Sequence, residues 1–405
     1  MTELAVWVGN RRVGTLHYAD YAHTFRYDTP AALDPHLDLV SLTMPVRMKS
    51  YDTQVLPPPF QSVLPEGDLL LRLRFRYGKA LDLDTDVNLL RLVGHNTIGR
   101  LTFRDVDDAE PVEGAGPEAK QDRRHKELPL DSILRHPDAA ELLSELIDIY
   151  GIRSGVGGVH PKVLLEGHGR QLTLTSEDLI LKAAGAQYPH LPVNEFFCMQ
   201  ASRASGIPTT TCHLSDRRDL LVLERFDRGN KGEALAFEEM CALLRLGRNG
   251  KYNGSYEQIA QVIRSIPCQN VTQTMETFFR MVLLAMATRN GDAHLKNFGV
   301  LYDTTGAVHL APAYDLVTTT VYLAKDHPAL ELGGRKLWAS KEQLFDFGTG
   351  PCDLRPAVVR RSLEAVRVGL VDTAKDLERF GSENPEFNEL SQGMRRQWQL
   401  GLQGL

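Results

Sequence analysis

The chain has 405 residues, 42% of them hydrophobic, and a formal net charge of -6 at pH 7. This length suggests two or three domains, and the acidic balance excludes a broad basic surface for direct binding of nucleic acid. No apolar run approaches the roughly 20 residues of a membrane-spanning helix. Five scattered cysteines without a C-x-x-C pair favour reduced thiols over disulfides or zinc. Together with an N-terminus that lacks a signal-peptide pattern, these features predict a soluble cytoplasmic protein.

The first hundred residues are rich in predicted strands. Strands are expected within 3–18, around a turn at Gly9-Asn10, and over 23–28, 39–45 and 96–106. Residues 68–80 predict a helix with alternating basic residues. The segment 105–128 is charged and nearly free of aliphatic residues, which predicts a linker or long loop.

The second half of the chain is mainly helical in prediction. Helices are expected over 142–150, 194–208, 276–290 and 355–380. Strands are expected within 153–167, 171–175, 178–185 and 220–228, the last of them leaving into a loop. Asn194 is a candidate N-cap for its helix, which Gly206 and Pro208 would end. A strand-rich half beside a helical half predicts a ligand cleft between two lobes.

One short stretch, NGDAHLKN over 290–297, concentrates polar chemistry between a predicted helix and a predicted hairpin. The hairpin would return Asp315 beside Asn297, five positions after Asp292. Phosphoryl transfer needs a carboxylate that accepts a hydroxyl proton and oxygen ligands for Mg²⁺. We therefore expect Asp292 to be the catalytic base, and Asn297 and Asp315 to be the metal ligands.

Two other side chains of this stretch have less defined roles. His294 is expected to support the loop by hydrogen bonds in preference to direct acid–base work, and no second ligand at zinc spacing accompanies it. Lys296 is expected to face the transferred phosphate, with a solvent-facing lysine as the alternative.

Three upstream features fit nucleotide binding. The glycines of SGVGGVHPK, residues 154–162, could bring backbone amides to phosphate oxygens, although an ordinary glycine turn is the alternative. Lys182 ends an apolar strand, as the phosphate-binding lysine of kinases does, with an ordinary surface lysine at a strand end as the alternative. Glu195 could be its ion-pair partner or could stabilise its own helix through the helix dipole. The buried strand that begins the stretch 220–228 opens into a linker at Glu224, Arg225 and Phe226, where a kinase would hold adenine.

The motifs resemble those of HipA-type serine/threonine kinases over nearly the whole chain. The stretches that carry the resemblance, in chain order, are WVGNRRVGTL, SLTMPV, LPEG, GRLTF, GGVHPK, LILK, NEFFCMQASRASGIP, LERFDR, EEMCALL, NGDAHLKNFGVL and APAYDL. The resemblance implies an α+β, protein-kinase-like fold of two lobes, with an extra strand-rich N-terminal subdomain and an all-helical C-terminal lobe. The expected boundaries are 1–110 for the N-terminal subdomain, 111–130 for the linker, 131–228 for the kinase N-lobe and 229–405 for the C-lobe.

The resemblance also implies ATP and Mg²⁺ as cofactors and transfer of phosphate to a protein serine. The residues expected to bind the nucleotide are Gly157, Gly158, His160, Lys162, Lys182, Glu224, Phe226 and Tyr314. Members of the family are bacterial toxins. They are usually neutralised by a HipB-like helix-turn-helix antitoxin, through which they reach DNA, and several act on aminoacyl-tRNA synthetases.

Many members phosphorylate a serine of their own glycine-rich loop, and here the sequence departs from the family. Ser154 lies one residue further from Lys162 than the usual serine, Gly155 takes that serine's place, and His160 replaces a common glutamine. Self-phosphorylation of Ser154 is therefore a hypothesis. Two other functions stay open: a small-molecule kinase of the aminoglycoside-phosphotransferase type, and a non-catalytic corepressor or partner of a DNA-binding antitoxin.

Overall fold

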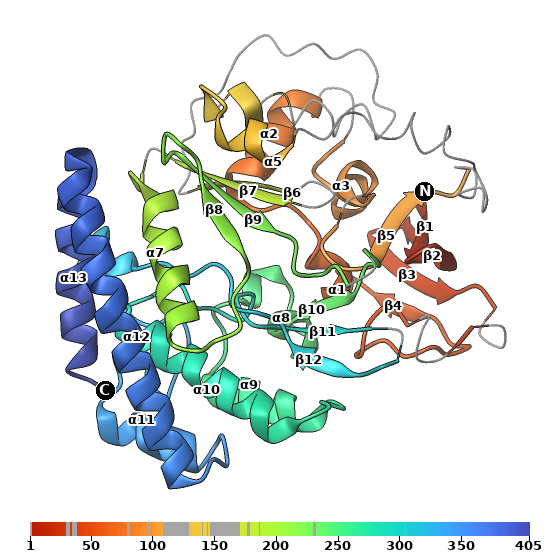
Figure 1. Ribbon diagram of the computed structural model, residues 1–405. Helices are drawn as coiled ribbons and strands as arrows, with labels where there is room; N and C mark the ends of the chain where they lie inside the picture. Colours follow the sequence, from red (N-terminus) through yellow and green to blue (C-terminus); the bar gives the residue numbers. More distant parts are fainter. Residues whose placement is uncertain are drawn as a thin grey trace.

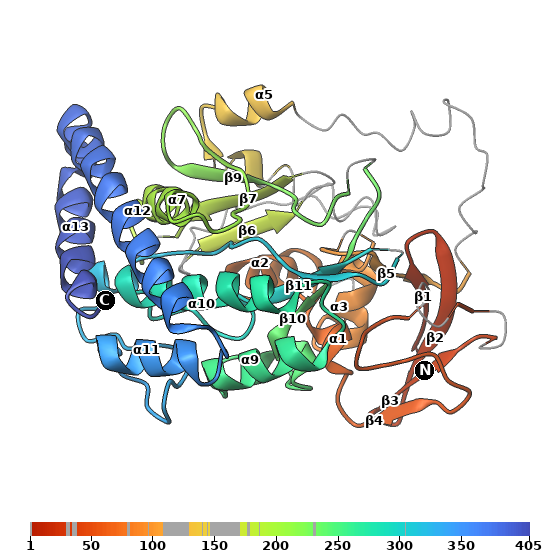
Figure 2. The same cartoon turned by 60° about the horizontal axis from the view of Figure 1, so that its bottom comes forward.

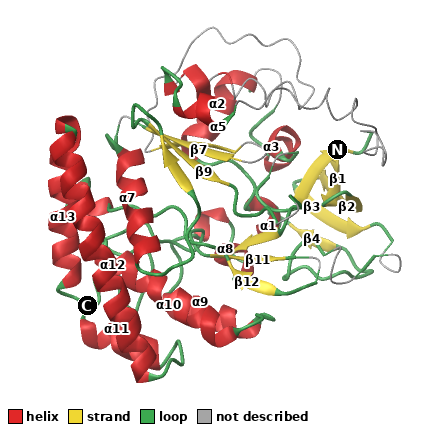
Figure 3. Ribbon diagram, viewed as in Figure 1, coloured by secondary structure: helices red, strands yellow, loops and turns green. Residues whose placement is uncertain are grey.

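The computed structural model describes residues 2–29, 33–34, 39–78, 82–95, 97–107, 129–139, 141–143, 145, 171–175, 179–185, 187–229, 232–303 and 305–405. The N-terminal sheet lies at one end of the molecule and helices α11 (Lys341–Thr349), α12 (Pro356–Glu383) and α13 (Asn388–Leu402) at the other (Figures 1 and 2). Figure 3 shows helices alone at the α11–α13 end, whereas helices and strands are mixed in the rest of the molecule. None of the helices in the described part of the chain is long and apolar enough to cross a membrane.

The N-terminal subdomain is built on an antiparallel five-stranded sheet in the order β4-β3-β2-β1-β5. Its strands are β1 (Thr2–Val8), β2 (Arg11–Ala19), β3 (Ala22–Tyr27), β4 (Tyr51–Thr53) and β5 (Leu101–Asp105), and its helices are α1 (Pro58–Gln61), α2 (Gly67–Tyr77) and α3 (Asp86–Val93). The turn expected at Gly9-Asn10 joins β1 to β2, and Gly9 has a φ of 59°, which glycine adopts without strain.

The strand expected over 39–45 is wrong. This segment forms a turn with a single bridge between Ser41 and Met44. The buried Tyr27 hydroxyl accepts a hydrogen bond from the Val40 amide and donates one to the Met44 carbonyl. A side chain thus satisfies backbone groups that a neighbouring strand would otherwise pair.

The segment expected to form the N-lobe contains a second antiparallel sheet, in the order β6-β7-β9-β8. Its elements are β6 (Gln171–Thr175), β7 (Leu179–Ala184), β8 (Cys212–Leu214), β9 (Leu220–Glu224) and helix α7 (Leu191–Ala204), and the short helix α5 (Leu130–Leu134) precedes them. Successive residues of β9 alternate between two cores. Leu220 and Val222 pack with the N-terminal subdomain, whereas Leu221 and Leu223 pack with the helical region. The N-lobe is therefore packed against its neighbours on both faces.

Helix α7 begins at Leu191, so the expectation that Asn194 caps it is wrong. Asn194 is fully buried inside the helix. Its side-chain amide donates to the Thr318 carbonyl and its oxygen accepts from the Thr318 amide. Asn194 thereby ties α7 to the segment that follows Asp315.

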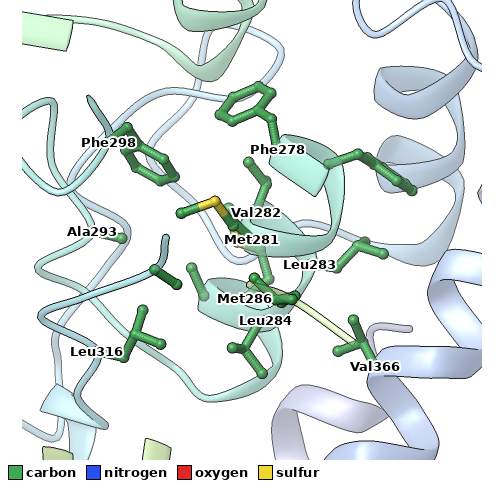
Figure 4. Packing of buried hydrophobic residues seen from close by; sticks show 14 of the residues in the cluster. Phe278, Met281, Val282, Leu283, Leu284, Met286, Ala293, Phe298, Leu316 and Val366 are labelled. Carbon is green, nitrogen blue, oxygen red and sulfur yellow. The ribbon is translucent and has the colours of Figure 1, made fainter. Parts of the chain in front are cut away.

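The C-terminal region is helical around one small sheet, β10-β11-β12. The strands are β10 (Ala236–Glu239), β11 (Gly299–Tyr302) and β12 (Val308–Leu310), and the other helices are α8 (Met240–Leu243), α9 (Tyr256–Ser265) and α10 (Val271–Ala287), with short 3-10 turns at Arg248–Gly250, Thr319–Val321 and Pro385–Phe387. Helix α10 is at the centre of the packing, and Ala293, Phe298 and Leu316 pack beside it (Figure 4). The same core therefore supports the segments around Asp292 and Asp315.

A buried ion pair joins the N-terminal subdomain to the end of β9. Arg225 Nε donates a hydrogen bond to Asp227 Oδ1 at 2.9 Å, and both side chains are almost completely buried. Asp227 also accepts from the Gly99 amide at 2.6 Å, and Arg225 donates to the Thr97 carbonyl. The pair is thus satisfied by hydrogen bonds on both of its sides.

Replacing Asp227 with alanine should lower the free energy of unfolding by about 3 kcal/mol, because the substitution leaves the Arg225 charge buried without its carboxylate. Chemical denaturation of the two proteins measures the difference. The matched control is Asp376→Ala, which removes an exposed partner of Arg379 and should change stability by less than about 0.5 kcal/mol. Equal effects of the two substitutions would contradict the prediction.

Candidate active site

The catalytic-loop candidate follows directly after α10. Arg289 has a φ of 56°, in the left-handed region, and this turns the chain out of the helix. The Asp292 amide then donates to the Asn290 side chain at 3.0 Å, and the buried Leu295 anchors the loop in the core. The end of α10, the turn at Arg289 and the buried Leu295 together hold Asp292 at the edge of the hydrophobic core.

The hairpin β11–β12 returns Asp315 to this loop, as the sequence predicted. The Asn297 amide nitrogen lies 3.2 Å from Asp315 Oδ2, and the Lys182 ammonium lies 2.7 Å from Asp315 Oδ1. Asp315 has a φ of 58°, and such strain in a non-glycine residue is common at functional sites. Lys182 also pairs with Glu195 at 2.6 Å, so of the two roles considered for Glu195 the structure contains the ion pair.

The charges of this cluster stabilise one another. Burial alone would lower the pKa of Lys182, but Asp315 and Glu195 outweigh it and raise that pKa above its ordinary value. Burial alone would raise the pKa of Asp315, but the Lys182 ammonium holds it below its ordinary value. Lysine and aspartate are therefore both charged near neutral pH.

Lys296 lies in a second charged cluster. Its ammonium is 2.9 Å from Glu66 Oε1 and 3.5 Å from Glu239 Oε2, and Glu66 Oε2 is 2.9 Å from the Lys251 ammonium. Burial works against ionisation of Glu66, but Lys296 and Lys251 lower its pKa to about 2. Burial raises the pKa of Glu239 to about 7. Two carboxylates thus hold the ammonium that was expected to face the phosphate.

Asp292 is contacted from outside its loop by a tyrosine. The Tyr252 hydroxyl donates to Asp292 Oδ1 at 2.8 Å. The Tyr252 ring packs edge-to-face on the His294 ring, with 5.2 Å between centroids. Burial lowers the pKa of His294, which favours its neutral form. His294 therefore supports the loop by ring packing; the hydrogen bonds expected of it are not found in the described part of the chain, where its buried Nδ1 has no hydrogen-bond partner.

Aromatic side chains form one wall of the cavity beside these groups. Phe226 and Tyr314 stack with 5.0 Å between centroids and 11° between planes, and the Tyr314 hydroxyl donates to the Lys296 carbonyl. The cavity has a volume of about 620 Å³. Its lining comes from the N-terminal subdomain and from the rest of the chain, and includes Leu64, Glu66, Lys182, Phe226, Asp292, Asn297, Tyr314 and Asp315. Glu224 lies at the end of β9, where its carboxylate contacts His213.

The donor set fits ATP with Mg²⁺. Asn297 and Asp315 supply hard oxygen ligands, and no group of three or more His, Cys, Asp or Glu side chains suited to a metal occurs among the described residues. Mg²⁺ is usually held by one or two carboxylates together with substrate phosphates and water, so a small ligand set of this kind is appropriate. Lys182 could bind the nucleotide phosphates, and the aromatic wall could pack on the adenine ring.

Some expected residues lie outside the described part of the chain, and some contacts were not expected. Ser154, Gly157, Gly158, His160 and Lys162 belong to the first group. Glu66, Tyr252 and Glu239 belong to the second. Glu66 and Glu239 lie in LPEG and EEMCALL, two stretches that carry the family resemblance, but no role was expected for either, and no motif marked Tyr252.

Comparison with known proteins identifies the family. Residues 154–374 match the HipA-like C-terminal domain, and residues 4–104 match the HipA N-terminal domain. The chain belongs to the HipA family. The N-terminal match favours this family over the aminoglycoside-phosphotransferase alternative.

Relatives of this HipA-family chain are named as kinases, and the chain is a kinase of the serine/threonine type. It is 27% identical over 336 residues to the putative kinase Y4mE of Sinorhizobium fredii, a match covering 79% of this chain and 78% of that protein. It is 26% identical over 195 residues to the serine/threonine-protein kinase toxin HipA of Shewanella oneidensis, covering 42% of this chain and 44% of the toxin.

A solved structure has the same fold. The HipA chain in the complex of Shewanella oneidensis HipA, HipB and operator DNA superposes with a TM-score of 0.68 at 18% identity, covering 99% of this chain and 96% of that one. The two-lobe α+β fold with its added N-terminal subdomain is thereby confirmed.

Proposed function

We propose that this chain is the toxin of a toxin–antitoxin pair, which uses ATP and Mg²⁺ to phosphorylate a serine or threonine of a protein. The observation that carries the chemistry is the convergence of Lys182, Asn297 and Asp315 in one cavity with Asp292. Phosphoryl transfer depends chiefly on positioning and charge neutralisation, and these side chains supply both.

Each residue has a defined task in this proposal. Asp292 accepts the proton of the attacking hydroxyl, and Lys182, fixed between Glu195 and Asp315, binds the nucleotide phosphates. Asn297 and Asp315 hold Mg²⁺, which neutralises phosphate charge when bound. Phe226 and Tyr314 pack on the adenine. His294 supports the loop, and the ion pairs of Lys296 favour a role in holding the loop over contact with the transferred phosphate.

The partner proposed is a HipB-like helix-turn-helix antitoxin, through which the chain would reach DNA. A neighbour of the same fold is a HipA bound to HipB and operator DNA, and this supports the proposal. An aminoacyl-tRNA synthetase is the protein substrate that the family resemblance suggests. Ser154 is proposed as a site of self-phosphorylation, to be tested by mapping phosphosites after incubation of the purified chain with ATP.

Phosphoproteomics of cells that express the wild type or Asp292→Asn, with recovery of bound partners, tests the function. New phosphoserines or phosphothreonines should appear on a few proteins with the wild type alone, and a small helix-turn-helix protein should be recovered with both. Transfer to a sugar or an antibiotic without any protein phosphorylation would contradict the proposal.

A further inference from the structure

The segment 248–252, between α8 and α9, contacts both the N-terminal subdomain and the catalytic loop. It is held from the N-terminal side by three residues. Gln61 Oε1 accepts from the Arg248 amide at 3.0 Å, Asp86 pairs with the Arg248 guanidinium at 2.9 Å, and Glu66 pairs with the Lys251 ammonium at 2.9 Å. These contacts are partly shielded from solvent, so they restrain the segment more than exposed pairs would.

The other side of the same segment is bonded to the catalytic loop. The Leu295 amide donates to the Lys251 carbonyl at 3.0 Å, and the Tyr252 hydroxyl donates to Asp292 Oδ1 at 2.8 Å. The Lys336 ammonium, 2.8 Å from the Tyr252 carbonyl, fixes the tyrosine backbone. A continuous path of bonded groups therefore runs from Glu66 through Lys251 and Tyr252 to the carboxylate of Asp292.

The hydrogen bond at the end of this path affects how well Asp292 can act as a base. The torsion that turns an aspartate carboxylate is broad, so an oxygen is aimed only when a neighbour fixes it. The hydrogen bond from the Tyr252 hydroxyl to Oδ1 restricts that rotation and so fixes the direction in which the carboxylate meets an acceptor hydroxyl. Lys251, the residue before Tyr252, is anchored on Glu66, and this ion pair helps to place the tyrosine.

We propose that the N-terminal subdomain orients the catalytic aspartate, with Glu66 and Tyr252 as positioning residues. The inference rests on the proposed function, in which Asp292 is the base. Glu66 acts through Lys251 and through Lys296, which it contacts in the catalytic loop itself. The subdomain is then a working part of the acceptor site, and a partner that shifts it would change the rate of transfer.

Tyr252→Phe is the sharpest test, because it keeps the ring on His294 and removes only the hydroxyl. The acceptor is a phosphatase-treated, heat-inactivated bacterial lysate, and the readout is the rate of labelled phosphate incorporation at varied ATP. The maximal rate should fall about tenfold, because small misplacement of a catalytic group is costly. The KM for ATP should change by less than about twofold and the melting temperature by less than about 1 °C, because neither depends on this hydroxyl.

Glu66→Gln should also lower the maximal rate. The double variant, Glu66→Gln with Tyr252→Phe, should have a rate within about twofold of the slower single variant, because both substitutions act on one carboxylate. Asp105→Asn is the matched control: it weakens an ion pair with Arg91 elsewhere in the N-terminal subdomain and should leave the rate unchanged.

Unchanged or faster transfer by Tyr252→Phe or Glu66→Gln would overturn the inference. So would a double variant whose loss of rate is the product of the two single losses, or a control that loses as much rate as Glu66→Gln. Failure of the proposed function looks different, because the wild type itself would then show no incorporation that depends on Asp292.

Discussion

Asp292→Asn should reduce phosphate transfer by about 10³-fold or more, while the affinity for ATP stays within about twofold of the wild type. Asparagine keeps the size of the side chain but cannot accept the proton of the attacking hydroxyl. Because the nucleotide would be held by Lys182, Asn297 and Asp315, its binding does not depend on Asp292. Initial rates of labelled phosphate incorporation and titration of ATP measure the two quantities separately.

The control is Asp303→Asn, the same substitution at the exposed turn of the hairpin between Asn297 and Asp315. Asp303 there accepts hydrogen bonds from Thr305. Its replacement should leave transfer within about twofold of the wild type, because Asp303 is not among the residues that line the cavity. Full activity of Asp292→Asn would place the base elsewhere and would remove the basis for the proposed mechanism.

The geometry around Asp292 was largely predictable because it is local in sequence. A helix, a short loop and a hairpin fix the separation of Asp292, Asn297 and Asp315, and each of these elements has its own pattern of apolar and turn residues. The Lys182–Glu195 pair was predictable for the same reason, since a strand and the next helix bring them together. The ion pair was one of two predicted roles for Glu195, because a glutamate near the start of a helix can instead stabilise the helix dipole.

The contacts of the N-terminal subdomain were not predictable from the sequence. Glu66 and Lys251 are 185 positions apart, and no local pattern relates a glutamate in a loop to a lysine before a distant helix. The Arg225–Asp227 pair was missed for a related reason. Charged residues at the end of an apolar strand usually indicate a return to solvent, whereas here the backbone of Thr97 and Gly99 covers them.

The error over 39–45 has a different cause. An apolar stretch rich in β-branched and aliphatic residues fits a strand, yet strand pairing is decided by which backbone groups remain available. The Tyr27 hydroxyl occupies the Val40 amide and the Met44 carbonyl, and Ser41 turns instead toward Glu238 of β10. The segment therefore joins the N-terminal subdomain to the C-terminal region instead of extending a sheet.

Asp315→Asn should weaken ATP binding in the presence of Mg²⁺ by about tenfold or more, and should slow transfer as well, because charged hydrogen bonds are lost at both carboxylate oxygens. The substitution leaves Glu195 as the one carboxylate paired with Lys182. The new side-chain NH2, a donor, would also face another donor, either the Lys182 ammonium or the Asn297 amide nitrogen. Backbone strain does not explain the loss, since asparagine tolerates the left-handed conformation at least as well as aspartate.

Asp353 offers a matched control for this last variant, because it is exposed and has a φ of 52°, close to the 58° of Asp315. Asp353→Asn should leave ATP binding unchanged. Removal of Mg²⁺ by EDTA should weaken binding to the wild type strongly and to Asp315→Asn little, because the variant has already lost the ligand through which the metal acts. An Asp315→Asn protein whose ATP binding still rises with Mg²⁺ as in the wild type would show that the metal is held by other residues.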